Sequence, residues 1–177
     1  MTVSDHLPTL SLDEINRMSP RDFRRALGGV FEGSPWIAER ALAARPFASR
    51  DGLHEAMVRV MREASREEQL ALLSAHPDLA LRAARASALS AASRSEQSGA
   101  GLDRLSDHDY QRFERLNARY RERFGFPFII AVRRHDAESI LAAFERRLHQ
   151  PVDEEIETAL SEVADITRFR LAALVTA

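Results

Sequence analysis

The sequence predicts an all-α, single-domain bundle of about eight helices. Its 177 residues, 45% of them hydrophobic, can bury one core and leave little chain for a second. We therefore expect one domain over residues 1–177, with a short N-terminal arm at 1–10. Residues that start helices recur along the whole chain, and the apolar residues between them repeat with the helical period. These observations favour helices packed on helices.

In the first half of the chain, serine and proline mark the expected helix starts. We expect helices that begin at Ser11 (with Glu14 in a capping box), at Ser19 (before Pro20, ending at Gly28), at Ser34 (before Pro35, ending before Pro46), at about Leu53 (ending near Ala64) and at Ser65 (with Glu68, halted by Pro77).

The second half of the chain continues this pattern. An alanine- and leucine-rich stretch runs from Leu79 to about Ala92, and Ser93 with Glu96 then repeats the capping-box spacing. Further helices are expected from Ser106 to Gly125, from Asp136 to about His149, and after Pro151. Between them, residues 126–132 form an apolar run whose proline and β-branched residues suit an extended buried segment.

Two residue types are missing from the sequence, and their absence excludes several kinds of chemistry. There is no cysteine, which excludes thiolate catalysis, iron–sulfur clusters and disulfides. All 25 basic residues are arginine, so no lysine can hold pyridoxal phosphate or complete a phosphate-binding loop. The six histidines show no i, i+4 pair, and there is no Gly-x-Ser-x-Gly elbow. We therefore expect neither a metal site nor serine hydrolase chemistry.

The charge pattern favours a small-molecule partner. The formal net charge is −2, and the 25 basic and 27 acidic residues are scattered, so no basic face for nucleic acid stands out. No apolar run is long enough to span a membrane, and no signal peptide is visible. We expect a cytoplasmic protein that binds neither nucleic acid nor membranes.

Three places in the sequence could carry chemistry. His76 precedes Pro77, which pushes it out of helical geometry, so the histidine should project from a helix end. The run Ser93–Gln97 gathers a cap residue, a carboxylate and an amide at an expected helix start, where free N–H groups could bind an anion. His76 could instead do no more than cap its helix, and Ser93–Gln97 could be an ordinary capping box. Arg170 falls on the apolar stripe of the last helix, so its guanidinium needs either a protein carboxylate or a ligand anion.

Several motifs together are similar to one family. They are Phe31-Glu32 with Ser34-Pro35-Trp36, His76-Pro77-Asp78-Leu79, Ser93–Gln97, Ala100-Gly101-Leu102, Leu116-Asn117, Tyr120 and Arg123–Ile129. In this order they resemble the 2-oxo-4-hydroxy-4-carboxy-5-ureidoimidazoline (OHCU) decarboxylase family over roughly residues 11 to 174.

The resemblance implies an all-helical, usually dimeric enzyme that needs no cofactor and forms (S)-allantoin at the end of urate breakdown. His76 matches the catalytic histidine, and we expect Glu96 to assist it. The resemblance and the polar cluster together give the substrate-binding positions, which are Pro77, Ser93, Arg94, Ser95, Gln97, Phe128, Ile129, Ile130, Ala131, Val132 and Arg170.

The sequence departs from the family at one place. The family usually has glycine shortly after His-Pro-Asp-Leu, whereas this chain continues Ala80-Leu81-Arg82, which suggests a more helical backbone there. Because of Leu81, the alternative remains that this chain is a relative of the family that acts on another small ureido or imidazoline acid. A helical interaction module, with the Ser93/Glu96 pair as a mere cap, is the alternative outside enzymes.

Overall fold

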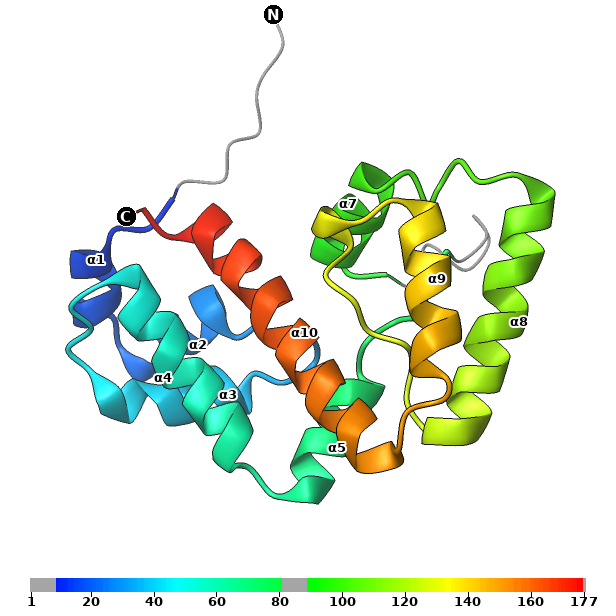
Figure 1. Ribbon diagram of the computed structural model, residues 1–177. Helices are drawn as coiled ribbons and strands as arrows, with labels where there is room; N and C mark the ends of the chain where they lie inside the picture. The colour runs from blue at the N-terminus through cyan, green and yellow to red at the C-terminus, as the bar shows by residue number, and fades with distance from the viewer. Residues whose placement is uncertain (1–8, 81–88, 177) are drawn as a thin grey trace, which may run out of the picture. The chain divides into compact units, whose positions relative to one another are not determined.

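The computed structural model describes residues 9–80 and 89–176, and this part of the chain is all-α (Figure 1). Within it there are nine α-helices, two short 3-10 helices and no strand, apart from one isolated bridge between Leu10 and Val175. The elements are α1 (Leu12–Arg17), α2 (Pro20–Leu27), α3 (Trp36–Ala41), η1 (Leu42–Ala44), α4 (Arg50–Glu63), α5 (Arg66–Ser74), α7 (Ala91–Gly99), α8 (Asp107–Phe124), η2 (Val132–Arg134), α9 (Ala137–Arg147) and α10 (Val152–Leu174). The predicted fold class is confirmed.

The helices belong to two compact units. One contains the chain up to Leu72 and from Ala164 onward, and the other contains Leu73–Val163. Helices α5 and α10 each contribute to both. The prediction of a single domain stays a prediction.

Most of the predicted helix starts are confirmed by their capping hydrogen bonds. Ser11, Ser19, Ser106 and Asp136 each accept a hydrogen bond from the backbone N–H three residues later. Ser65 and Glu68 exchange the two bonds of a capping box, at 3.0 and 3.2 Å. These caps need only neighbours in sequence, which is why local patterns locate them.

In the first half of the chain, two predicted helix starts are wrong. Helix α4 begins at Arg50 rather than near Leu53, because the Ser49 hydroxyl accepts a hydrogen bond from the Gly52 N–H at 2.9 Å. Helix α3 has Pro35 at its N-cap position without a side-chain cap, so Ser34 does not cap it. The φ of Pro35, −62°, already suits a helix.

Helix α8 has an apolar stripe, and the segment after it is non-helical and buried as predicted, except that its last residue, Val132, begins η2. The helix α8 stripe buries Phe113, Leu116, Tyr120 and Phe124. Residues 126–131 are not helical, and 126 and 128–131 are buried. In the part of the chain described here, no helix has the length and hydropathy to cross a membrane.

In the first unit, His54 links α4 to the second half of α10. Its Nε2 lies 3.0 Å from the Ala164 carbonyl oxygen and 3.1 Å from the Thr167 hydroxyl. Burial, together with the nearby charge of Arg168, lowers the pKa of His54 below its usual 6.5. The folded state therefore favours the neutral imidazole.

We expect this histidine to weaken the fold in acid. The unfolded chain binds a proton near pH 6.5 and the folded chain at lower pH, so stability is lost as pH falls below about 6.5. The extra slope of unfolding free energy approaches at most about 1.4 kcal/mol per pH unit, the value for one proton. Urea unfolding between pH 8 and 5 should show a shallower slope for His54→Gln than for wild type. The exposed His149→Gln should keep the wild-type slope, and an unchanged slope in His54→Gln would contradict this assignment.

Candidate functional site

His76 lies two residues beyond the end of α5, in the second unit. Its backbone N–H donates to the Leu73 carbonyl at 3.2 Å, and the residue is buried, with 6% of its surface exposed. The prediction that it leaves the helix at its end is confirmed. A histidine held at the start of a loop can face a ligand more readily than one inside a helix.

The loop that follows His76, residues 77–80, is attached to two helices by side chains. Asp78 Oδ1 accepts a hydrogen bond from Arg121 Nε of α8 at 2.8 Å. The carbonyl of Leu79 accepts from Asn117 Nδ2, also on α8, at 2.9 Å. The Gln97 side chain of α7 accepts a hydrogen bond from the Ala80 N–H at 3.0 Å and donates one to the Asp78 carbonyl at 3.3 Å.

At Ala80 this loop has a left-handed backbone. Its φ is 54°, in the region that favours glycine, and the residue is 97% buried. The expectation of a more helical backbone is therefore wrong at Ala80, where the Gln97 carboxamide holds the N–H in place. Leu81 and Arg82 lie outside the described residues.

We predict that Ala80→Gly leaves stability within about 1 kcal/mol of wild type. Relief of left-handed strain, about 1–2 kcal/mol, offsets the lost methyl burial and the greater freedom of the unfolded chain. Ala143 is equally buried but lies in right-handed α9, so Ala143→Gly should cost about 2 kcal/mol. Equal losses in the two variants, measured by urea unfolding, would show that Ala80 carries no strain.

Helix α7 begins earlier than the sequence suggested. Ser90 is the N-cap, and its hydroxyl accepts from the Ser93 N–H at 3.2 Å, so Ser93 and Glu96 are not a capping box. The two alanines after Ser90 favour helix and extend it by a turn. The idea that Ser93–Gln97 offers free N–H groups at a helix start is therefore wrong.

The helical period sorts the predicted residues of α7 by face. Ser93, Glu96 and Gln97 share one face, on which Ser93 and Gln97 are buried and Glu96 is half-buried. Arg94 and Ser95 are exposed, and Arg94 donates to the Leu89 carbonyl at 3.3 Å. Of these five residues, only Ser93, Glu96 and Gln97 can therefore belong to a buried site.

The extended segment Phe128–Val132 lies in the same unit. Helix α7 packs against η2, which begins at the last residue of this segment. The N–H of Ala131 donates to Glu162 Oε2 of α10 at 2.8 Å. The loop after His76, helix α7 and this segment are therefore neighbours.

A buried ion pair fixes the other end of the segment. The Arg147 guanidinium contacts Glu155 at 2.6 and 2.9 Å, with 3% and 0% of the two side chains exposed. Arg147 Nη1 also donates to the Ile129 carbonyl at 2.8 Å, and its guanidinium lies over the Phe128 ring at 4.3 Å. Tyr120 donates its hydroxyl to Glu155, and burial, followed by this carboxylate, raises the pKa of Tyr120. Its hydroxyl therefore stays protonated as the donor.

Arg170 lies in the first unit. It is buried, as the stripe predicted, and its Nη1 lies 2.9 Å from Glu32 Oε2. It also donates to the Val30 carbonyl at 3.4 Å. A carboxylate of the protein therefore pairs with the guanidinium of Arg170. A role for Arg170 toward a ligand stays a prediction.

Sequence reasoning missed the loop contacts of Asn117 and Arg121. One signal was present, because Asn117 is a polar residue within the apolar stripe of α8 and is 92% buried. Arg121 carried no such signal among its many neighbouring arginines. Across residues 9–80 and 89–176, no group of three or more potential metal ligands is found.

Comparisons with known proteins agree on one family. A family model described as OHCU decarboxylase matches residues 16–172. The 2-oxo-4-hydroxy-4-carboxy-5-ureidoimidazoline decarboxylase of Haloferax volcanii is 48% identical over 92% of this chain and 95% of its own. The Mus musculus protein of the same name is 37% identical over 92% and 91%. The uric acid degradation bifunctional protein PucL of Bacillus subtilis is 40% identical over 94% of this chain and 33% of its own.

Two solved structures have a similar fold. A crystal structure of (S)-allantoin synthase matches with a TM-score of 0.76 and 28% identity, covering 94% of this chain and 54% of that one. A crystal structure of OHCU decarboxylase in the presence of (S)-allantoin matches with a TM-score of 0.68 and 22% identity, covering 89% and 98%. The second likeness concerns the fold alone.

Proposed function

Since this chain belongs to the OHCU decarboxylase family, we propose that it converts OHCU to (S)-allantoin and carbon dioxide in urate degradation. The observation that carries the proposal is the gathering of three elements in one unit. The loop after His76 is bonded to α7 through Gln97, and α7 packs against η2 at the end of the Phe128–Val132 segment. These elements hold all but one of the site residues that the family resemblance implies.

The substrate can supply its own electron sink. One ring carbon carries both the hydroxyl and the carboxylate and lies beside a ring C=N bond. When the bond to the carboxylate breaks, its electron pair forms a C=C bond, and the C=N electrons move to nitrogen, which takes a proton. The hydroxyl then loses its proton to become a carbonyl, and the neighbouring carbon is protonated. The protein needs only to position groups and move protons.

We assign the proton transfers to His76, which takes the hydroxyl proton, with Glu96 orienting the histidine or the ureido group. Protonation of carbon on one face gives the (S) configuration. Pro77, Ser93, Gln97 and Phe128–Val132, which lie in one unit, would line the substrate. The Ala131 N–H already donates to Glu162, so a ligand would use a neighbouring N–H or displace that carboxylate.

We also propose that the enzyme works without a cofactor, as a cytoplasmic homodimer. The lack of lysine and cysteine supports the first point, because a Schiff base and a thiolate are both impossible. The dimer rests on the family resemblance.

The proposed function is tested by making OHCU from urate with the two upstream enzymes and following the circular dichroism of allantoin. We expect this protein to make (S)-allantoin much faster than spontaneous decay does. A folded sample that gives no acceleration would reject OHCU as substrate. It would then favour another small ureido or imidazoline acid.

A further inference from the structure

We propose that Asn117 and Arg121 of α8, together with Gln97 of α7, are positioning residues that fix the loop carrying His76. The inference rests on the proposed function, because it assigns these side chains a part in that reaction. None of the three needs to touch the substrate for this role. They act on the backbone and side chain of residues 78–80.

The first attachment is the ion pair between Arg121 and Asp78. Nε and Oδ1 are 2.8 Å apart, and the side chains are 44% and 24% exposed. Exposed pairs add little to stability, typically about 0–1 kcal/mol. Asp78 is two residues from His76, and Pro77 between them has a fixed φ, so restraint of Asp78 limits where the histidine can lie. The pair is therefore better suited to placing the loop than to stabilising the fold.

The second attachment is Asn117, whose surroundings would suit an apolar residue better. It lies on the stripe that buries Leu116 and Tyr120, and among the described residues its Oδ1 has no hydrogen-bond partner. An unsatisfied buried polar atom costs about 1–3 kcal/mol. The carboxamide nitrogen donates its hydrogen bond to the Leu79 carbonyl. An asparagine at this position therefore serves to hold the loop.

The third attachment, Gln97, holds the loop at its most strained point. Its oxygen accepts from the N–H of Ala80, the residue with φ 54°, and its nitrogen donates to the Asp78 carbonyl. Strained backbone persists where surrounding contacts over-determine it. Three consecutive loop residues are thus held from two helices, and a misplacement of about 1 Å can cost as much as 100-fold in rate.

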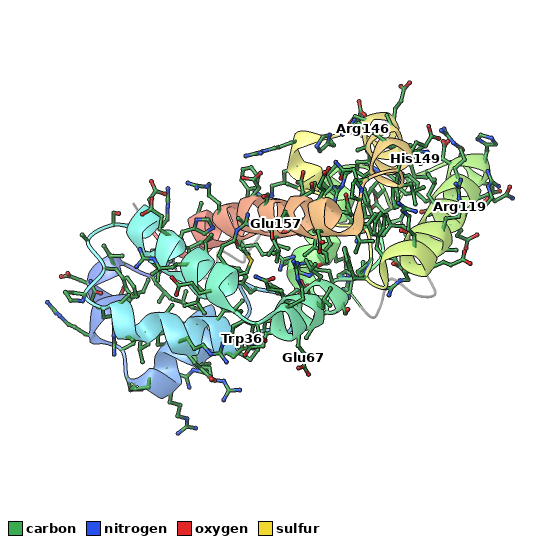
Figure 2. The ribbon with its side chains drawn as sticks, turned by 60° about the horizontal axis from the view of Figure 1, so that its bottom comes forward. Trp36, Glu67, Arg119, Arg146, His149 and Glu157 are labelled. Atoms are coloured by element: carbon green, nitrogen blue, oxygen red, sulfur yellow. The ribbon has the colours of Figure 1, made fainter. Side chains whose placement is uncertain are left out.

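The test compares Arg121→Gln with Arg119→Gln, a matched variant of an exposed arginine on the same helix (Figure 2). We expect Arg121→Gln to lower kcat about tenfold with KM within about twofold, and Arg119→Gln to match wild type. Melting temperatures of both should stay within about 3 °C of wild type, because the pair is exposed. Asp78→Asn should have the same effect, and the double variant should be no worse than either single one.

A second readout does not depend on the substrate. Amide hydrogen exchange of the peptide containing residues 75–80 should be faster in Arg121→Gln than in wild type and Arg119→Gln. Inactivity of the wild type toward OHCU would reject the proposed function but leave this comparison valid. Unchanged exchange, kcat equal to that of Arg119→Gln, or multiplied losses in the double variant would each overturn the positioning role.

Discussion

His76→Asn should lower kcat about 100- to 10,000-fold, the range that a positioned acid–base group supplies. Asparagine has a size similar to that of histidine but cannot exchange a proton near neutral pH, so the variant removes proton transfer and little else. The backbone N–H bond to Leu73 remains available, and the fold should persist. Turnover is measured by allantoin dichroism, and folding by far-ultraviolet dichroism and urea unfolding.

The matched control is His149→Asn. His149 is an exposed histidine after α9, labelled in Figure 2, and its loss should leave kcat and stability unchanged. Full activity in His76→Asn would remove the proton-transfer role from this residue. Loss of activity together with unfolding would instead assign it a structural one.

Arg147→Met should lower the free energy of unfolding by about 3–5 kcal/mol, the loss expected when one partner of a buried ion pair is removed. Glu155 is fully buried and would be left without its guanidinium partner. The Ile129 carbonyl would also lose its donor, so the Phe128–Val132 segment should loosen. Urea unfolding measures the loss.

The neighbouring Arg146 supplies the control. It is exposed, and Arg146→Met should change stability by no more than about 0.5 kcal/mol (Figure 2). Arg147→Met combined with Glu155→Leu should recover part of the loss, because the buried charge is then removed as well. Equal stability of the two arginine variants would show that the ion pair contributes nothing. A double variant less stable than Arg147→Met would show that Glu155 does not depend on this partner.

Local patterns in the sequence determined much of this protein. Caps such as Ser106 and Asp136, the stop at Gly125 with φ 79°, and the buried segment after it follow from residues within a few positions of one another. The inward direction of Arg170 followed from the helical period alone. These features need no distant partner, because backbone preferences and hydrophobic periodicity act locally.

The tertiary structure decided which distant groups meet. Sequence left the anion of Arg170 open, and the fold supplies Glu32, which is 138 residues away. Asn117 reaches the Leu79 carbonyl across 38 residues, and Arg121 reaches Asp78 across 43. No local pattern contains such pairs, because packing brings them together and hydrogen-bond geometry selects them. The sequence therefore determined the helices and the candidate His76, while the side chains that hold its loop became visible only in the folded chain.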